Sequence, residues 1–251
     1  MRHMLKEERQ RHILEWLQKN KTVLLPGMSR ELGVSEDTVR RDIKELSAQG
    51  FLKEVRGGAI PHALGPHGLK ERENFAGRQK QRMAKKAVKL IKKGQVIILD
   101  GGTSTLAVAS ILPENLQITV ITNSFPIANL LEEKKGIDLI FAGGRLFRES
   151  FITTGQDTCG FYQQIKADTC FLGVCSIDLE SGLTGQYYDE SAVKKTMIKS
   201  SRQVIALATP EKLNTAEAFH ICPIQSLSGL ITTSPDIDLL KPYRKAGIRV
   251  L

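Results

Sequence analysis

A short run after a buried strand combines the groups that bind anions. It follows the apolar residues Val96 to Leu99 and holds one carboxylate, two glycines and three hydroxyl residues: Asp100, Gly101, Gly102, Thr103, Ser104 and Thr105. Glycines let a ligand approach the backbone closely. The helix predicted to start here offers unbonded amides and the positive end of its dipole. A phosphate site would use these groups, but an ordinary strand-to-helix turn has the same residues, so spacing alone leaves both interpretations open.

A second run predicts a helix with a basic outer face. Ser35 stands at the N-cap position, and Val39, Ile43 and Leu46 follow as one apolar stripe. At about 100° per residue, burial of that stripe turns the basic residues outward, where they could enter a DNA major groove. The candidate DNA contacts are Ser35, Thr38, Arg40, Arg41 and Lys44, with Arg56 on the segment that follows. A charged helix face that is only solvated remains the alternative.

The elements around this helix predict a winged helix-turn-helix domain over residues 1–60. Helices are expected before Asn20 and after Pro26, and Gly33 breaks the second one. Residues 51–60 then form two short strands around the Gly57-Gly58 turn. The proline- and glycine-rich stretch beyond it begins a linker, which we place at residues 61–74.

From residue 75 to residue 251 the pattern predicts an α/β domain with a mainly parallel sheet. A basic amphipathic helix that contains Met83 and Ala87 opens the domain. Unbroken apolar runs of the buried-strand kind then alternate with helical segments. The predicted strands are residues 96–99, 118–121, 137–141, 170–174, 204–207 and 229–231, and the predicted helices between them are 103–112, 125–134, 190–200 and 236–246.

Charge is distributed unevenly along the 251 residues. The net charge is +9, and residues 1–93 carry more than all of it, since residues 94–251 are slightly acidic. That asymmetry favours a nucleic-acid partner near the N-terminal end, although solvated lysines at 80–93 explain part of it equally well. No apolar run is long enough to span a membrane, and no signal-peptide core is visible, so a cytoplasmic protein is expected.

The cysteines and histidines predict no metal site. Four cysteines occur without a Cys-x-x-Cys pair, and none of the five histidines stands at ligand spacing from them, although His220 and Cys222 make a weak candidate. Buried free thiols are the simpler interpretation. No cofactor is expected either.

The segment from Leu32 to Leu46, with its run Val34-Ser35-Glu36-Asp37-Thr38-Val39-Arg40-Arg41-Asp42, resembles the signature of the DeoR family of bacterial sugar-metabolism regulators. Further similarities extend over residues 5–233. The effector domain of that family is related to ribose-5-phosphate isomerase and the coenzyme A transferases. The resemblance therefore implies that Asp100 to Thr105 form a phosphate loop, and that Asn123, Gly143, Gly144 and Glu190 belong to the same pocket.

Two departures from the family pattern affect the expected effector. The family commonly has Asp-Ser-Ser-Lys where this chain has Thr209-Pro210-Glu211-Lys212, so only Lys212 remains to balance a phosphate. Ser176 replaces a glycine that often precedes Ile-Asp.

The resemblance implies a DNA-binding transcriptional regulator, a repressor of a sugar operon that is released or modulated by a phosphorylated sugar. Its partners would be double-stranded operator DNA, that effector and further copies of the chain, because paired half-sites restore specificity. We expect no catalytic residue. The main alternative is a sugar-phosphate isomerase that uses Asp100, Asp178, Glu190 or Lys212, and an RNA-binding or architectural protein is a third.

Overall fold

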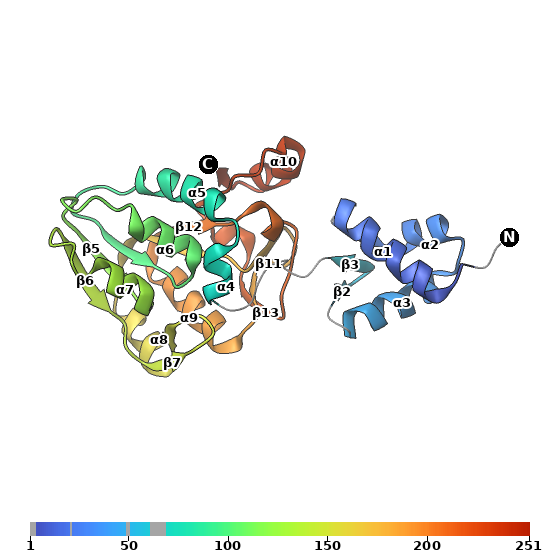
Figure 1. The fold of residues 1–251 in the computed structure, drawn as a ribbon, viewed down its shortest axis with the longest axis horizontal. Helices are drawn as coiled ribbons and strands as arrows, with labels where there is room; N and C mark the ends of the chain where they lie inside the picture. Colours follow the sequence, from blue (N-terminus) through green and yellow to red (C-terminus); the bar gives the residue numbers. More distant parts are fainter. Residues whose placement is uncertain (1–3, 21, 49–50, 61–68) are drawn as a thin grey trace.

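The computed structural model describes residues 4–20, 22–48, 51–60 and 69–251. Its N-terminal part has three helices and a small antiparallel sheet in the strand order β1-β3-β2 (Figure 1). The elements are α1 (Lys6–Asn20), β1 (Val23–Leu24), α2 (Leu25–Leu32), α3 (Glu36–Ala48), β2 (Lys53–Val55) and β3 (Gly58–Ile60). The three helices and the β2–β3 hairpin occur where the sequence predicted them, whereas β1 was not expected.

Local chemistry explains the turn between α2 and α3. Gly33 adopts the left-handed conformation with φ +64°, which ends α2 as a C-terminal glycine does. The Ser35 hydroxyl accepts a hydrogen bond from the Thr38 amide at 3.2 Å and so caps α3, as predicted. Val39, Ile43 and Leu46 are buried in a core of their own with residues of α1, α2 and the small sheet.

A buried ion pair fixes α1 against α3. Arg9 donates to both carboxylate oxygens of Asp42, at 2.8 and 3.2 Å. The Asp42 side chain is only 3% exposed, so a residue of the predicted DNA-reading signature serves the packing of the domain instead. The hydrogen bond that Arg9 donates to Asp42 raises the pKa of Arg9 above its ordinary value.

The last part of the segment expected to be a linker is helical. Residues 61–68 of it lie outside the described residues, but residues 69–74 form α4 (Leu69–Asn74). Leu69 is buried, and its amide donates to the Glu149 carbonyl at 3.0 Å. This turn of helix therefore belongs to the larger domain, which the helix α5 (Gly77–Val88) continues.

A seven-stranded sheet forms the centre of the larger domain. Its strand order is β15-β14-β12-β9-β4-β5-β6, and every neighbouring pair is parallel. The strands are β4 (Val96–Leu99), β5 (Ile118–Thr122), β6 (Ile137–Phe141), β9 (Ala167–Gly173), β12 (Ser201–Leu207), β14 (Gly229–Ile231) and β15 (Arg249–Val250). All six predicted strands are present, and the parallel pairing is confirmed.

Helices cover both faces of this sheet (Figure 1). One core contains α5, α6 (Thr103–Ser110) and α7 (Phe125–Leu131), packed on side chains such as Ile97 and Leu99. The other contains α8 (Gln156–Gln163), α9 (Tyr188–Lys199) and α10 (Ile237–Lys245), packed on alternating residues such as Ile98. Because side chains alternate along a strand, one apolar run supplies both cores.

Two smaller sheets were not predicted from the sequence. One is the antiparallel sheet β10-β11-β13, made of β10 (Ser176–Asp178), β11 (Gly182–Gly185) and β13 (Phe219–Cys222). The other is the hairpin of β7 (Arg145–Phe147) and β8 (Ile152–Thr154). Both matter for the site, because β11 and the turn before β8 contribute to its walls. Among the described residues, no helix is long and apolar enough to cross a membrane.

Candidate functional sites

The outward face of α3 carries the cations that the sequence placed there. Arg40, Arg41 and Lys44 are exposed, while Val39 and Ile43 on the opposite side are buried. Arg40 donates to the Asp37 carboxylate at 2.6 Å on the open surface, where such a pair is worth little and can be exchanged for another acceptor. A helix with this face is suited to a DNA major groove.

The fold brings Arg56 close to this helix. Arg56 is exposed at the turn between β2 and β3, and it lines the same shallow hollow as Arg40. Gly58 makes the arrangement possible, because a Cβ there would lie 1.7 Å from the Val23 carbonyl oxygen on β1. At the start of α3, the hydroxyls of Ser35 and Thr38 lie 2.9 Å apart and hydrogen-bond to each other. All six predicted DNA contacts thus belong to one small unit.

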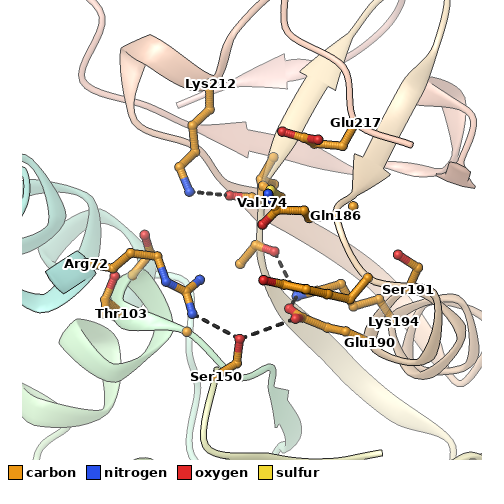
Figure 2. A pocket seen from close by; sticks show the side chains of 17 residues that line it. Arg72, Thr103, Ser150, Val174, Gln186, Glu190, Ser191, Lys194, Lys212 and Glu217 are labelled. Atoms are coloured by element: carbon orange, nitrogen blue, oxygen red, sulfur yellow. Dashed lines mark hydrogen bonds and ion pairs between the residues drawn. The ribbon is translucent and has the colours of Figure 1, made fainter. Parts of the chain in front are cut away.

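A pocket lies at the carboxyl ends of β4 and β9, the edge where open α/β sheets bind ligands (Figure 2). It encloses about 790 Å³ of space free of protein atoms, counting its open mouth. Gly101, Gly102, Thr103 and Ser104 form one wall, and the first turn of α6 supplies the helix N-terminus predicted from the sequence. The predicted anion-binding loop therefore lines a real pocket.

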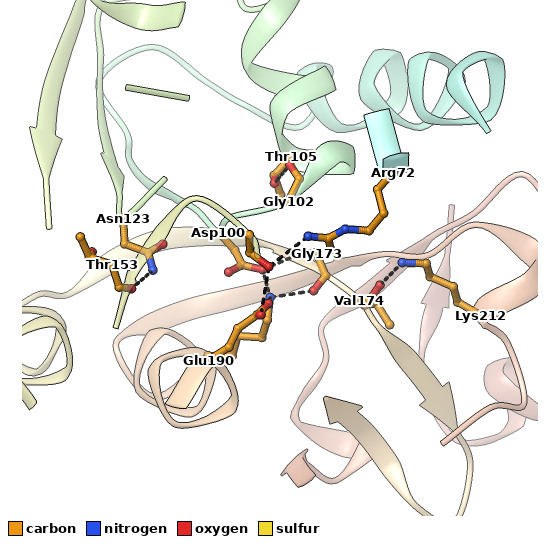
Figure 3. Close-up of polar contacts among 12 residues, drawn as sticks. Arg72, Asp100, Gly102, Thr105, Asn123, Thr153, Gly173, Val174, Glu190 and Lys212 are labelled. Carbon is orange, nitrogen blue, oxygen red and sulfur yellow. Dashed lines mark hydrogen bonds and ion pairs between the residues drawn. The ribbon is translucent and has the colours of Figure 1, made fainter. Parts of the chain in front are cut away.

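Asp100 lies behind this wall and does not face the pocket. It is 1% exposed, accepts a hydrogen bond from the Gly173 amide at 2.9 Å, and forms an ion pair with Lys194 on α9 (Figure 3). Lys194 also donates to the Gly173 carbonyl at 3.0 Å and lies 3.5 Å from Glu190. Asp100 therefore braces the loop by joining β4, β9 and α9.

Burial and pairing act in opposite directions on these two groups. Burial raises the pKa of Asp100, and the attraction of Lys194 offsets only part of that rise. Burial lowers the pKa of Lys194, but the charges of Asp100 and Glu190 more than compensate, so it is raised overall. Lys194 thus carries its positive charge into the wall of the pocket.

Two further cations line the pocket beside Lys194. Lys212 donates to the Val174 carbonyl at 2.7 Å, and burial lowers its pKa. Arg72 enters from α4 and donates to the Ser150 hydroxyl at 3.0 Å (Figure 2). Glu190 and Glu217 line the same pocket, so cations and hydrogen-bond acceptors face one ligand-sized space.

Several predicted pocket residues lie elsewhere. Asn123 is fully buried and donates to the Thr153 carbonyl at 2.7 Å. Gly144 is needed for packing, since its φ is +141° and a Cβ would lie 2.1 Å from the Thr158 hydroxyl. Gly143, beside it, is exposed. None of these three is among the residues that line the pocket, and Thr105 turns its hydroxyl back to the Gly102 carbonyl at 2.9 Å.

Sequence reasoning missed Arg72, Ser150, Lys194 and Glu217. Lys194 had a usable signal, because it stands one helical turn after Glu190 and so shares its helix face. Arg72 was assigned to the linker. Ser150 and Glu217 are single polar residues in loops, and no spacing in the sequence marks them. Within the described residues, no cluster of three or more histidines, cysteines and acidic residues could hold a metal ion.

The fold and sites define a class: a regulator with a helix-turn-helix domain for DNA and a separate domain with a ligand pocket. Residues 9–62 match the DeoR-like helix-turn-helix domain, and residues 76–234 match the DeoR C terminal sensor domain. The chain belongs to the DeoR family of transcriptional regulators. It is a DNA-binding regulator and not an enzyme.

Relatives of full length agree with this assignment. The chain is 32% identical to the HTH-type transcriptional regulator GlpR of Haloferax volcanii, over 99% of this chain and 98% of that one. It is also 32% identical to the HTH-type transcriptional repressor GlcR of Bacillus subtilis, over 91% and 89% of the two chains. Among solved structures, the sorbitol operon regulator SorC of Klebsiella pneumoniae is 13% identical over 94% of this chain and 98% of that one, with a TM-score of 0.45. That likeness is too distant to support an argument.

Proposed function

We propose that this regulator represses a sugar-utilisation operon and that a phosphorylated sugar, or a close derivative, bound in the pocket releases it from operator DNA. The observation that carries the proposal is the composition of the pocket. A glycine loop and the start of α6 stand beside three cationic side chains: Arg72, Lys194 and Lys212.

Each part of the pocket suits a different part of such a ligand. The amides of the loop, the Thr103 and Ser104 hydroxyls and the cations can all donate to phosphate oxygens, in charge-assisted bonds about twice as strong as neutral ones. The carboxylates of Glu190 and Glu217 can accept hydrogen bonds from sugar hydroxyls. A neutral sugar would bring no negative charge to attract these cations.

The names of the relatives support a phosphorylated effector. One is the glycerol-3-phosphate regulon repressor of Haemophilus influenzae, 31% identical over 80% of this chain and 79% of that one. GlcR of Bacillus subtilis is itself a repressor. We extend to this chain both the repressor role and a phosphate-bearing ligand.

Pocket and DNA-binding domain are connected physically. The Lys53 ammonium group on β2 donates to the main-chain carbonyl of Glu217, a residue of the pocket wall. Ligand binding that moves this wall would therefore alter how the DNA-binding domain is held, which is the coupling that a release mechanism needs. We further propose that the chain acts as a homo-oligomer on paired half-sites in the cytoplasm, where its operator is located.

DNA binding can be tested by fluorescence anisotropy with the promoter DNA of the chain's own operon. Arg41→Ala should weaken binding about 5- to 150-fold, because an arginine bonded to a base edge contributes about 1–3 kcal/mol. Arg244→Ala, which removes an exposed arginine of α10, is the matched control and should leave affinity unchanged. Equal affinities of the two variants would contradict the assignment of α3.

Effector response can be tested by DNA release with a panel of sugar phosphates and the corresponding neutral sugars. Only the phosphates should release DNA. Thr103→Val should raise the required concentration about tenfold, because it removes one donor to a charged group and keeps the shape. Thr119→Val, at the opposite end of the sheet, is the control. Release by neutral sugars at the same concentration would refute the proposal.

A further inference from the structure

The short helix α4 occupies a special place between the two functional sites. It begins at Leu69, directly after residues 61–68, and those residues join it to the DNA-binding domain. At the same time it lies against the pocket, and the side chain of its Arg72 lines the pocket (Figure 2). Arg72 also lies outside residues 76–234, the part of the chain that matches the sensor domain.

The guanidinium group of Arg72 has hydrogen-bonding capacity left over. Its Nη2 atom donates to Ser150, but its buried Nε atom finds no acceptor among the residues that the structure describes. A buried donor without a partner is costly. A phosphate can accept two parallel bonds from one guanidinium group, so an anion in the pocket would satisfy this nitrogen in a geometry that lysine cannot reproduce.

The surroundings of Arg72 favour an anion as the missing partner. Lys212 lines the same pocket, and Lys80 of α5 donates to the Arg72 and Phe75 carbonyls. Burial, together with the positive charges of Lys212 and Arg72, lowers the pKa of Lys80 to about 8. Glu190, a carboxylate of the same pocket, already accepts from Ser150 and pairs with Lys194.

The helix itself depends on these contacts. Six residues are too few for a helix that is stable alone in water, so α4 is held by Leu69, Arg72 and the Lys80 hydrogen bonds. As a helix the six residues span about 9 Å, and fully extended they would span about 20 Å. Residues 61–74 join the two domains and are called the tether below. Unfolding of α4 would therefore lengthen the tether by about 11 Å.

We infer that Arg72 binds the phosphate group of the effector in the pocket. This contact fixes α4 and so sets the length of the tether to the DNA-binding domain. The inference rests on the proposed function, in that it assumes a phosphate-bearing effector. It adds to the phosphate site a side chain from outside the matched sensor domain, and it connects the pocket directly to the linker.

The first test measures anion binding to the full chain by calorimetry at constant ionic strength. The probes are inorganic phosphate and glycerol 3-phosphate, with glycerol as the neutral control. Arg72→Gln should weaken binding of both anions about tenfold or more, and Arg72→Lys should fall between it and the wild type. Arg78→Gln, an exposed arginine on α5, should bind as the wild type does.

The outcomes separate the inference from the proposed function. If the wild type binds neither anion, the phosphate pocket itself is wrong. If the wild type binds and Arg72→Gln binds equally well, the pocket stands and the role of Arg72 is refuted. Should Arg72→Gln fail to fold, Arg72→Lys decides: affinity equal to the wild type would overturn the need for a guanidinium group.

The second test follows the tether by hydrogen exchange of the amides in residues 69–74. Saturating inorganic phosphate should slow their exchange in the wild type and in Arg78→Gln, but not in Arg72→Gln at the same concentration. An unchanged exchange rate in wild-type α4, at a phosphate concentration that saturates the pocket, would refute the link between ligand and tether.

Discussion

Replacement of Lys194 by methionine should destabilise the larger domain severely, because it leaves the Asp100 carboxylate buried without its counter-charge. Asp100 is 1% exposed and would keep a single hydrogen bond, from the Gly173 amide. Removal of one partner of a buried ion pair typically costs about 3–5 kcal/mol. Domains of this size have about 5–15 kcal/mol of stability in total, so the variant should lose a large part of it.

A double variant tests whether charge is the reason. Asp100→Asn with Lys194→Met removes both charges and retains similar volumes. A buried ion pair replaced as a whole often costs little, so the double variant should be more stable than Lys194→Met alone. The defect should also depend on pH. Because burial raises the pKa of Asp100, its charged form is disfavoured in the folded protein, and the defect should grow as pH rises and disappear when Asp100 is protonated.

The assay is urea unfolding with two probes. The chain has one tryptophan, Trp16 on α1, so its fluorescence follows the DNA-binding domain. Far-UV circular dichroism follows both domains, and the transition without a fluorescence change belongs to the larger one. A loss below about 1 kcal/mol in Lys194→Met, or a double variant less stable than the single one, would refute the reasoning.

Three other predictions concern stability. The free energy of unfolding of the wild type should rise by up to about 3 kcal/mol between pH 8 and 10.5, because a lysine whose folded pKa is lowered to about 8 binds fewer protons when folded than when unfolded. Lys80→Met should abolish this rise, and equal pH slopes of the two proteins would contradict the prediction. Gly58→Ala should cost the DNA-binding domain about 2–3 kcal/mol, measured by Trp16 fluorescence in urea, because the new Cβ collides with the Val23 carbonyl. Asp42→Ala should cost about 2 kcal/mol in the same assay, and Arg9→Met added to it should restore part of the loss. A double variant no more stable than Asp42→Ala would contradict this.

The repeating elements could be predicted because their signals are local. The stripe of Val39, Ile43 and Leu46 was sufficient to predict the orientation of α3, and an unbroken apolar run such as Val96–Leu99 identified a strand buried on both faces. The glycine and hydroxyl loop was found because its chemistry is contiguous in sequence. Each of these inferences depends on neighbours within about two helical turns.

What could not be predicted depends on contacts between distant segments. Asp100 and Lys194 are 94 positions apart, and only the fold shows that the carboxylate pairs with α9 instead of facing a ligand. Arg72 was placed in a linker because the proline and glycine before it suggested irregular structure, whereas its contact with Ser150 is 78 positions away. The small sheet β10-β11-β13 could not be predicted for the same reason. Its strands are short, and α9 and β12 lie between β11 and β13 in the sequence.

Among the residues that the structure describes, the cores of the two domains share no side chain. The apolar residues buried around α3 all come from residues 4–59, and those around the large sheet all come from residues 83–251. Each domain therefore carries its own folding information, and the two can vary separately as long as the tether and the Lys53 contact are kept. An exchange of the segment up to Ile60 for that of a related chain should yield a chimera that answers the same metabolite at a different promoter.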